Sequence, residues 1–385
     1  MGQSVRVAIL SRRRAAQRVW HASQYEFEDV IAEIDDASLV SPLPRRVNEL
    51  GTMVHNASNR VGYRVGRARR ALMVPSDEVV DAEVFFAVFA APSEINALPH
   101  ATAQLKRSRR KVAFLIEMYE TQIESSRDYL RQLRGFDHIF VFTRSVIPAV
   151  ERITGVPTSF LATGVDAELF APRLPAPERH IDVMSYGRRL PRTHEVLTAA
   201  ARDDSLHYFY DTVAGRFDVS DHRDHRLALA AALQRSRFAL VYKNNDDPGR
   251  RARTAGEETL SNRYFEATSA GAVVLGTAPD VADFADNFDW PDAVVPIGAP
   301  APDILRTIEE LGSDPGRLAA ARRAGILAAL RRHDWAFRWR SVLESLELPE
   351  SPALAERIAR LEQRAVLHEA PASAQPPGHR ELRPS

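Results

Sequence analysis

Short apolar runs rich in Val, Ile, Phe and Tyr alternate along the chain with longer segments in which apolar residues recur every three or four positions. The runs predict buried strands and the longer segments predict amphipathic helices. Because the strand candidates are almost continuously apolar, both faces of each sheet should be covered, as in a parallel α/β fold. In the first half, the expected strands are Arg6–Leu10, Val84–Phe89, Lys111–Ile116, His138–Phe142 and Thr158–Ala162. The expected helices are Glu26–Ile34, Arg46–Arg67, Glu94–Arg107, Gln122–Leu133 and Ser145–Thr154.

This alternation stops at Pro172–Arg179 and then begins again. Three prolines within six positions make that segment the best linker candidate in the chain. The strands expected after it are Ile181–Tyr186, Leu206–Tyr210, Phe238–Tyr242, Ala272–Leu275 and Ala293–Pro296. The helices expected after it are Arg192–Arg202, Asp224–Ser236, Ser261–Ala270, Val281–Phe284, Pro302–Leu311, Pro315–Arg332 and Asp334–Leu346.

The pattern therefore predicts an α/β protein with two doubly wound halves facing a cleft. Ligands of open parallel sheets bind beyond the carboxyl ends of the strands, so the cleft is where we expect the site. The expected domains are residues 1–174 and 175–346. An amphipathic helix follows within residues 347–368. The Pro-, Ala- and Gln-rich residues 369–385 predict a disordered tail.

Composition excludes several classes of site and disfavours several classes of partner and location. The 385 residues include 51 basic and 51 acidic side chains, so the net charge is zero and nucleic acid is an unlikely class of partner. The absence of cysteine excludes disulfides, thiolate metal sites and cysteine nucleophiles, and is compatible with the cytoplasm. The apolar runs are far shorter than the roughly 20 residues of a membrane-spanning helix. Arg12–Arg14 follows the first apolar run, which is the wrong order for a secretory signal.

The stretch Lys243–Gly276 is the most informative for chemistry. A long polar loop follows a buried strand, and a helix predicted to begin at Ser261 follows the loop. The N-terminus of a helix offers unsatisfied N–H groups and a partial positive charge, which favour an anion. Glu258 lies just before this helix and Glu266 lies two turns along it, so two carboxylates flank the expected anion site.

These residues resemble a known family. Glu258 and Glu266 have the E-x7-E spacing of retaining glycosyltransferases with two Rossmann-like domains, the GT-B fold. The run Asn262–Gly276 (NRYFEATSAGAVVLG) is similar to the helix-and-strand signature of that family, and most similar to its spore-maturation-type subgroup. The resemblance implies that Glu266 binds the ribose of a nucleotide-sugar donor and that Glu258 binds the transferred sugar. It also implies that the backbone amides of Leu260, Ser261 and Asn262, at the start of the helix that carries Arg263, receive the diphosphate.

The resemblance also implies that the helix within residues 347–368 packs back on the first domain. Two further segments carry the same resemblance. Ile181–Arg192 resembles the opening of the donor domain, in which a Gly-Arg pair and a second basic residue neutralise the phosphates; the matching residues are Gly187, Arg188 and Arg192. The spacing to Arg192 is one residue shorter than the commonest form, and the family often has lysine there. Thr163–Pro172 is very similar to the GVD-x-x-x-F-x-P loop that ends the acceptor domain. Lys243, one of three lysines in the chain, ends a strand facing the expected cleft and is a further candidate donor contact.

The function that the resemblance implies is a metal-independent hexosyltransferase or related enzyme of bacterial polysaccharide or glycoconjugate biosynthesis. It needs no cofactor, takes a nucleotide-diphosphate sugar as donor, and retains the anomeric configuration. The acceptor is a hydroxyl of a sugar, a lipid-linked sugar or a small molecule. Ser11, Arg12 and Glu117 follow strands of the first half and are candidate acceptor contacts, although the family usually has a glycine-rich loop at the first of these positions.

Two other functions remain open from the sequence: a nucleotide-sugar epimerase or hydrolase on the same fold, and a non-catalytic cell-surface or spore-coat assembly protein. Two charged runs favour simpler interpretations. Asp221–His225 is better explained as a polar helix start than as a metal site, since no further ligands lie near it in sequence. Lys106–Lys111 is better explained as a solvated helix end than as a nucleic-acid contact.

Overall fold

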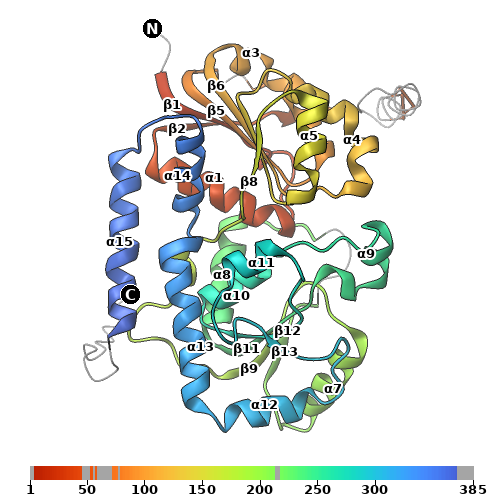
Figure 1. Ribbon diagram of the computed structural model, residues 1–385, viewed down its shortest axis with the longest axis vertical. Helices are drawn as coiled ribbons and strands as arrows, with labels where there is room; N and C mark the ends of the chain where they lie inside the picture. The colour runs from red at the N-terminus through yellow and green to blue at the C-terminus, as the bar shows by residue number, and fades with distance from the viewer. Residues whose placement is uncertain are drawn as a thin grey trace. The chain divides into compact units, whose positions relative to one another are not determined.

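A computed structural model of the chain describes residues 4–45, 53–54, 57–58, 72–76, 79–212 and 217–370. The chain divides into two compact units (Figure 1). The first unit consists of Met1–Thr163, Arg216–His225 and Arg338–Ala355, and the second of Gly164–Gly215, Arg226–Phe337 and Glu356–Ser385. Each unit is thus built from three separate stretches of chain, whereas the sequence predicted one crossing between residues 174 and 175 and a return to the first domain after residue 346.

A parallel sheet forms the centre of the first unit. Its strands are β1 (Ser4–Leu10), β2 (Ala37–Val40), β5 (Asp81–Phe89), β6 (Ser108–Leu115), β7 (His138–Val141) and β8 (Thr158–Phe160). Their order is β2-β1-β5-β6-β7-β8, and all these pairings are parallel. The five strands expected from the sequence are confirmed. β2 was not predicted, because it is short and three of its four residues are only partly buried.

Successive residues of β5 face opposite sides of this sheet. The ring of Phe85 lies 6.2 Å from that of Phe136 on one side. The ring of Phe86, the next residue, lies 5.5 Å from Phe27 and 5.3 Å from Trp339 on the other side. All five rings are buried. Both faces are therefore covered by apolar side chains, which explains why the strand is a continuous apolar run in the sequence.

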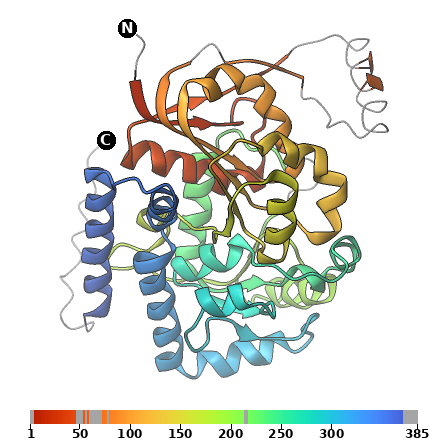
Figure 2. The ribbon, with the colours of Figure 1, turned by 45° about the horizontal axis from the view of Figure 1, so that its top comes forward.

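Helices cover the sheet of the first unit, and Figures 1 and 2 show α1 along one of its faces. The predicted helix Glu94–Arg107 is instead a 3-10 helix followed by a short α-helix, because Pro99 has no N–H to donate within a longer α-helix. The predicted helix Arg46–Arg67 lies almost wholly outside the described residues. The helical elements are η1 (Val19–His21), α1 (Ala22–Ile34), η2 (Pro92–Ala101), α3 (Thr102–Lys106), η3 (Glu120–Gln122), α4 (Ile123–Leu130), η4 (Arg131–Leu133), η5 (Arg144–Val146) and α5 (Ile147–Thr154). The short strands β3 (Leu43–Pro44) and β4 (Met73–Val74) pair antiparallel.

The second unit repeats the design around a smaller parallel sheet, whose strands are β9 (Ile181–Ser185), β10 (Tyr208–Tyr210), β11 (Ser236–Val241), β12 (Val273–Gly276) and β13 (Val295–Pro296). Their order is β10-β9-β11-β12-β13, and the five predicted strands are confirmed. The helical elements are α6 (Ala167–Phe170), α7 (Pro191–Arg202), α8 (His222–Gln234), η6 (Asn244–Asp246), α9 (Pro248–Arg253), α10 (Asn262–Ser269), α11 (Ala282–Asn287), α12 (Ile304–Gly312), α13 (Pro315–Ala328), η7 (Ala329–His333), α14 (Trp335–Ser345) and α15 (Pro352–Glu369). The first turn of α8 and most of α14 group with the first unit.

Two of these elements, η6 and α9, occupy a stretch that the sequence predicted to be a polar loop. The carboxylate of Asp247 accepts a hydrogen bond of 2.8 Å from the N–H of Arg250, and Pro248 occupies the first turn of α9. An Asp cap followed by proline is a standard helix start, so the local signal was present in the sequence.

The Gly-Val-Asp segment groups with the second unit because its hydrogen-bond partners belong to that unit. These partners lie about 170 residues later in the chain. The N–H of Val165 donates to the carbonyl of His333 at 3.0 Å, and the N–H of Trp335 donates to the carbonyl of Val165 at 3.2 Å. A Cβ on Gly164 would lie only 2.8 Å from that same carbonyl of His333, so this close approach requires glycine. The composition of the proline-rich linker contains no sign of this pairing, which is why the predicted boundary lies later in the chain than the division between Thr163 and Gly164.

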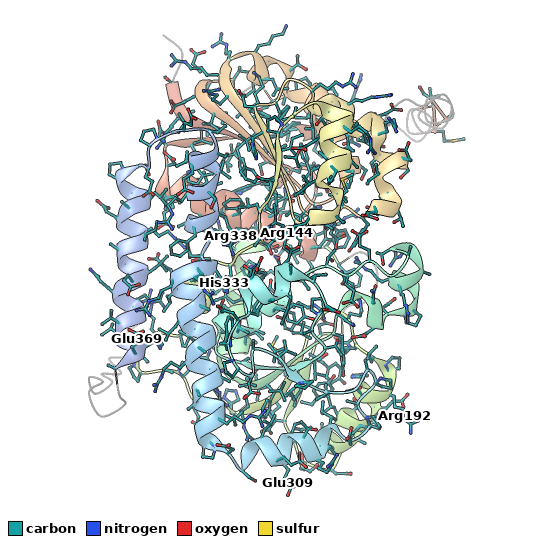
Figure 3. The ribbon with its side chains drawn as sticks, in the orientation of Figure 1. Arg144, Arg192, Glu309, His333, Arg338 and Glu369 are labelled. Atoms are coloured by element: carbon teal, nitrogen blue, oxygen red, sulfur yellow. The ribbon has the colours of Figure 1, made fainter. Side chains whose placement is uncertain are left out.

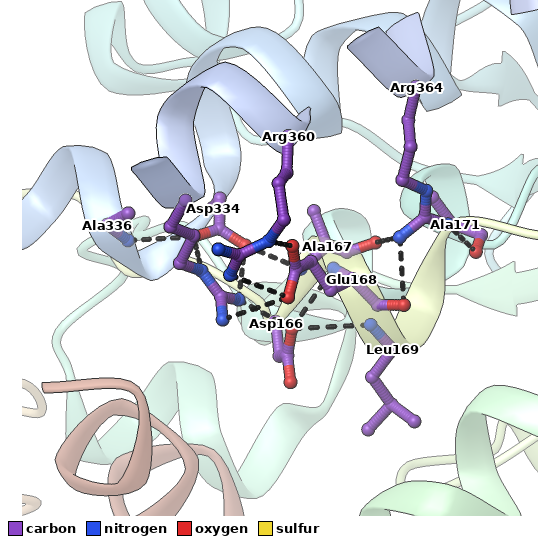
Figure 4. A network of polar contacts seen from close by, with 10 residues as sticks. Asp166, Ala167, Glu168, Leu169, Ala171, Asp334, Ala336, Arg360 and Arg364 are labelled. Carbon is purple, nitrogen blue, oxygen red and sulfur yellow. Dashed lines mark hydrogen bonds and ion pairs between the residues drawn. The ribbon is translucent and has the colours of Figure 1, made fainter. Parts of the chain in front are cut away.

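Helix α15 is fixed to the same segment by arginines (Figure 4). The fully buried Arg357 donates to Asp166 at 2.7 Å and to Asp334 at 2.9 Å. One turn later, Arg360 donates to Glu168 at 2.9 Å, and Arg364 then donates to the Glu168 carbonyl, also at 2.9 Å. A buried arginine between two carboxylates is stable only as a matched set, so this network ties α15 to the second unit.

The return of the chain to the first unit occurs earlier than predicted. Residues 338–355 group with the first unit, where the indole N–H of Trp339 donates to Asp35 at 2.9 Å, and residues from 356 onward group with the second. Helix α15 runs to Glu369, one residue beyond the predicted range of 347–368. The rest of the predicted tail, residues 371–385, lies outside the described residues. No helix in the described part of the chain has the length and apolar character needed to cross a membrane.

Candidate functional site

The carboxyl ends of β9, β11 and β12 lie next to one another in the second sheet. All three strands are parallel, so the residues that follow them gather at one edge. Helix α10 leads through a tight turn at Gly271, which has a φ of +70°, into the start of β12. Its own N-terminus, at Ser261, therefore lies toward the edge where these strands end.

Glu258 is held at this edge by groups that follow two of the strands. Its carboxylate lies 2.7 Å from the ammonium of Lys243, after β11, and accepts a 2.7 Å hydrogen bond from the N–H of Asp280, after β12. Burial alone would raise the pKa of Glu258, but the bond to Lys243 and the other donors hold the pKa below its usual value. The side chain is about one fifth exposed. The structure thus brings together Glu258 and Lys243, two residues that the sequence singled out separately.

Arg188 joins the same set through an asparagine. Its guanidinium donates to the side-chain oxygen of Asn244 at 3.0 Å and lies 3.8 Å from Asp247. The amide of Asn244 donates in turn to Thr259, the residue after Glu258, at 3.1 Å. The preceding Gly187 has a φ of +73°, a conformation that favours glycine, and its N–H donates to Asp211 at 2.6 Å.

Arg263 lies at the first turn of α10. Its side chain donates to the carbonyl of Tyr242 at 3.0 Å and to the Ser261 hydroxyl, which caps the helix, at 3.4 Å. Its remaining terminal nitrogen, Nη1, is buried and has no hydrogen-bond partner among the described residues. A Cβ on Gly187 would lie 3.8 Å from Arg263 Cδ, so the two motifs of the sequence meet here. Leu260, just before the cap, is buried, and Asn262 is the first residue of the helix.

Glu266 is buried, and the structure gives it a partner that sequence reasoning missed. Arg226 of α8 donates a short hydrogen bond to the Glu266 carboxylate, and both side chains are less than one tenth exposed. The guanidinium carbon of Arg226 also lies 4.5 Å from the centre of the Phe170 ring. Burial, and next the charge of Glu266, raise the pKa of Tyr186, which donates a 3.2 Å hydrogen bond to the Arg263 carbonyl.

A sequence signal for Arg226 existed. In α8, Arg226 lies four residues before Ala230 and seven before Leu233, and all three are buried. An arginine on the apolar face of an amphipathic helix needs a buried anion, and Glu266 on another helix of the same domain was a candidate for it.

The structure does not bring Arg192 into this group. Arg192 is exposed at the second position of α7, and its side chain points away from the ribbon (Figure 3). Arg189 is the neighbour that faces inward, with a 2.7 Å ion pair to Asp211. The irregular spacing noted in the sequence is therefore accompanied by a different placement of the second basic residue.

The acceptor-side candidates lie in the first unit. Ser11 is fully buried, and its hydroxyl donates to Glu28 at 2.5 Å. Burial raises the pKa of Glu28 despite this bond. Arg12 lies 2.8 Å from Glu94, whose carboxylate also bonds His21 at 2.7 Å.

Glu94 and Glu117 follow neighbouring strands of the same sheet. Burial alone would raise the pKa of Glu94, but the His21 bond and the charge of Arg12 lower it. Glu117 is exposed just after β6, and its N–H donates to the carbonyl of Ala90 at 2.9 Å.

The start of α8 is a polar helix start, as predicted. The carboxylate of Asp221 accepts a 2.7 Å hydrogen bond from the N–H of Arg223. His222 lies 2.8 Å from Asp29, and Arg223 donates to the same carboxylate. Arg13 donates to it as well, at 2.7 Å. Burial would raise the pKa of Asp29, but these three partners lower it.

Comparison with known proteins bears on the fold. Residues 178–344 match the model of a family described as glycosyl transferase-like, and this range contains Arg188, Glu258 and Glu266. A search of curated protein sequences finds no match. The chain is similar to a crystal structure of HepE from Anabaena in complex with UDP-glucose, with 10% identity over 89% of this chain and 99% of that chain and a TM-score of 0.50.

Two more distant solved structures are an alpha-glucosyltransferase in complex with UDP and a 13-mer DNA that contains an HMU base, and WaaG, a glycosyltransferase involved in lipopolysaccharide biosynthesis. The first shares 9% identity over 90% of this chain and all of that chain, with a TM-score of 0.48. WaaG shares 13% identity over 88% and 99%, with a TM-score of 0.43. At such identities, the likeness to HepE shows the fold alone. The predicted GT-B fold, with two Rossmann-like sheets, is confirmed.

Proposed function

We propose that the chain is a glycosyltransferase that transfers a hexose or related sugar from a nucleotide-diphosphate donor to a hydroxyl acceptor, with retention of configuration. One observation carries the proposal most directly. The buried Nη1 of Arg263, at the N-terminus of α10, has hydrogen-bonding capacity that no described residue uses. A phosphate oxygen is the type of group that such a position accepts. The match of this unit to a glycosyl transferase-like family supports the same assignment.

The diphosphate contacts follow from this placement. Arg263, the N–H groups at the start of α10, and Arg188 supply positive charge and donors at one edge of the sheet. As the bond between the anomeric carbon and the phosphate oxygen breaks, negative charge develops on the leaving diphosphate, and fixed donors stabilise it. We propose that these groups, rather than a metal ion, perform that role, and that no cofactor is needed.

The two carboxylates have different roles in this proposal. Glu258, partly exposed and paired with Lys243, accepts hydrogen bonds from hydroxyls of the transferred sugar. The Glu266 carboxylate, held in place by Arg226, accepts a hydrogen bond from a ribose hydroxyl. Arg226 makes a buried charge at Glu266 tolerable, since an unpaired buried carboxylate would be very costly. Arg226 is therefore a positioning residue for Glu266.

The acceptor then binds beyond the carboxyl ends of β1, β5 and β6 in the first unit, where Arg12, Glu94 and Glu117 are found. Ser11 contributes through Glu28 rather than directly, since its side chain is fully buried. We place the reaction in polysaccharide or glycoconjugate biosynthesis. We place it in the cytoplasm, a reducing compartment with which a chain without cysteine is compatible.

Product analysis tests the proposal. The protein is incubated with UDP-, GDP-, ADP- and dTDP-hexoses, each with and without a panel of glycoside acceptors, and the released nucleotide and the products are followed by NMR. We expect nucleoside diphosphate release that depends on the acceptor, together with a product of unchanged anomeric configuration. Release or isomerisation without acceptor would instead identify a hydrolase or epimerase, and inversion would contradict retention. Glu258→Gln should lower kcat by at least 100-fold, whereas the neighbouring control Glu257→Gln should not.

A further inference from the structure

Two short segments of the first unit pair with each other near the end of β1. The N–H of Val19 donates to the carbonyl of Phe217 at 2.9 Å, and the N–H of Val219 donates to the carbonyl of Gln17 at 2.8 Å. Arg18 and Asp218 form an antiparallel bridge between these bonds. The chain reaches this small ladder directly from the carboxyl end of β1, at Leu10. Ligands of open parallel sheets bind on that side of the strands.

The ladder presents two exposed aromatic side chains next to each other. Trp20 is 48% exposed and Phe217 is 40% exposed, and their ring centres are 6.4 Å apart in an edge-on arrangement. The guanidinium carbon of Arg18 lies 5.0 Å from the centre of the Trp20 ring. Phe217 has a φ of +52°, which a bulky residue rarely adopts, so the backbone is strained where it presents this ring. We call Trp20, Phe217 and Arg18 the aromatic platform.

Buried polar atoms with unused hydrogen-bonding capacity occur in the first unit, some of them on residues that adjoin the platform or are linked to it by ring contacts. The Trp20 ring lies 5.7 Å from His21, and a chain of ring contacts continues through Tyr25 to His222. Both histidines are buried, and the Nδ1 atom of each has no hydrogen-bond partner among the described residues. The same is true of Gln17 Oε1 and Arg12 Nε in this part of the unit.

The chemistry of these atoms favours one class of ligand. Arg12 Nε donates only and Gln17 Oε1 accepts only, whereas an imidazole nitrogen takes either role according to its tautomer. An anion would need donors and a cation would need acceptors, but sugar hydroxyls both donate and accept. A sugar ring also has an apolar C–H face that packs flat against an aromatic ring. These atoms are buried, so we assign the first contact to the exposed rings.

We propose that the aromatic platform binds a pyranose ring of the acceptor, which makes the acceptor a glycoside or oligosaccharide. This inference rests on the proposed function for the reaction, but the binding that it predicts is measured separately. The charge of the platform does not favour an anionic lipid surface, which is recognised by an excess of basic residues. Arg18 is instead paired with Asp218, at 3.8 Å.

Saturation-transfer NMR of the full chain tests the proposal, with maltose, cellobiose and the methyl glucosides and mannosides as probes and with UDP as an internal reference. We expect the wild-type protein to transfer saturation to the C–H protons of the sugar. Trp20→Ala and Phe217→Ala should each weaken sugar binding roughly fivefold to tenfold, because each variant loses one aromatic contact. Trp20→Tyr should retain most of the signal. The matched control is Phe209→Ala, since Phe209 is an aromatic residue of the second unit that is 45% exposed. Binding of UDP should be equal in all five proteins.

Three results would overturn the proposal: sugar binding unchanged in both alanine variants, no binding of any of these sugars by the wild type, or flotation with phosphatidylglycerol vesicles that depends on Trp20. Because the two side chains are about half exposed, we expect their replacement to leave the melting temperature unchanged. An unchanged melting temperature then excludes misfolding as the cause of lost binding. If the wild type binds these sugars but does not bind UDP, the proposed donor site is contradicted and the proposal for the aromatic platform still holds.

Discussion

Arg226 and Glu266 form an ion pair inside the second unit, and replacing either partner alone should be much more destabilising than replacing both. The side chains are 4% and 7% exposed, so neither charge reaches much water once its partner is gone. Removing one partner of a buried pair costs about 3–5 kcal/mol, because the other charge is left uncompensated. We therefore expect Arg226→Met to lower the free energy of unfolding by that amount.

The double variant Arg226→Met/Glu266→Leu should recover most of this loss, to within about 2 kcal/mol of wild type, since apolar groups of similar volume often replace a buried pair well. For a unit of this size, a loss of 3–5 kcal/mol corresponds to a fall in melting temperature of roughly 6–20 °C. A control exists in the same unit. Arg237 and Asp182 lie 2.7 Å apart but are 33% and 25% exposed, so Arg237→Met should cost less than about 1 kcal/mol.

Urea unfolding followed by far-UV circular dichroism measures these differences, with UDP binding measured on each folded variant. A loss below 1 kcal/mol in Arg226→Met, or a double variant whose loss equals the sum of the two single losses, would refute the pairing on which the positioning role of Arg226 depends. Arg226→Lys keeps the charge without the planar fork, and should lie between wild type and Arg226→Met in both stability and UDP affinity.

Three further outcomes follow from the same unit. A Cβ on Gly276 would lie 1.7 Å from the Val241 carbonyl oxygen, so Gly276→Ala should force β11 and β12 apart and lower the melting temperature sharply, whatever the ligand. The lowered pKa of Glu258 means that its pair with Lys243 stabilises the fold above the usual carboxyl pKa, and that this contribution is lost as the pH falls through the lowered pKa. The stability difference between wild type and Glu258→Gln, at most about 1 kcal/mol for partly solvated groups, should therefore decrease in urea titrations as the pH is lowered below the usual carboxyl pKa. Arg192→Met should leave the KM for the donor within about twofold, because the side chain is exposed on α7; a tenfold rise would restore the phosphate role that the sequence resemblance implied.

The succession of strands and helices could be predicted from the sequence because each buried strand is marked by a run of apolar residues. A buried strand such as β5 is apolar on both faces, and the sequence shows this directly. The assignment of segments to units had no such signal. Val165 is held by the carbonyl of His333, and Asp166 is held by Arg357, and neither partner is near in the chain.

The candidate site was predictable to a similar degree. The motif spacing predicted Glu258, Arg188 and the N-terminus of α10, and the structure brings these to one edge of the sheet. Arg226 was missed because its partner Glu266 lies 40 residues away in the chain. Arg192 was placed by analogy of type and approximate spacing, which does not determine on which side of a helix a residue lies.

Calorimetric titration with UDP, GDP and ADP, and with the matching monophosphates and nucleosides, tests the central claim most directly. If the diphosphate binds at the start of α10, one nucleoside diphosphate should bind the wild type at least tenfold more tightly than its monophosphate. Arg263→Met should abolish that preference while leaving the melting temperature of the free protein within a few degrees. Equal affinity for the diphosphate and the monophosphate, or a preference that survives in Arg263→Met, would contradict the account.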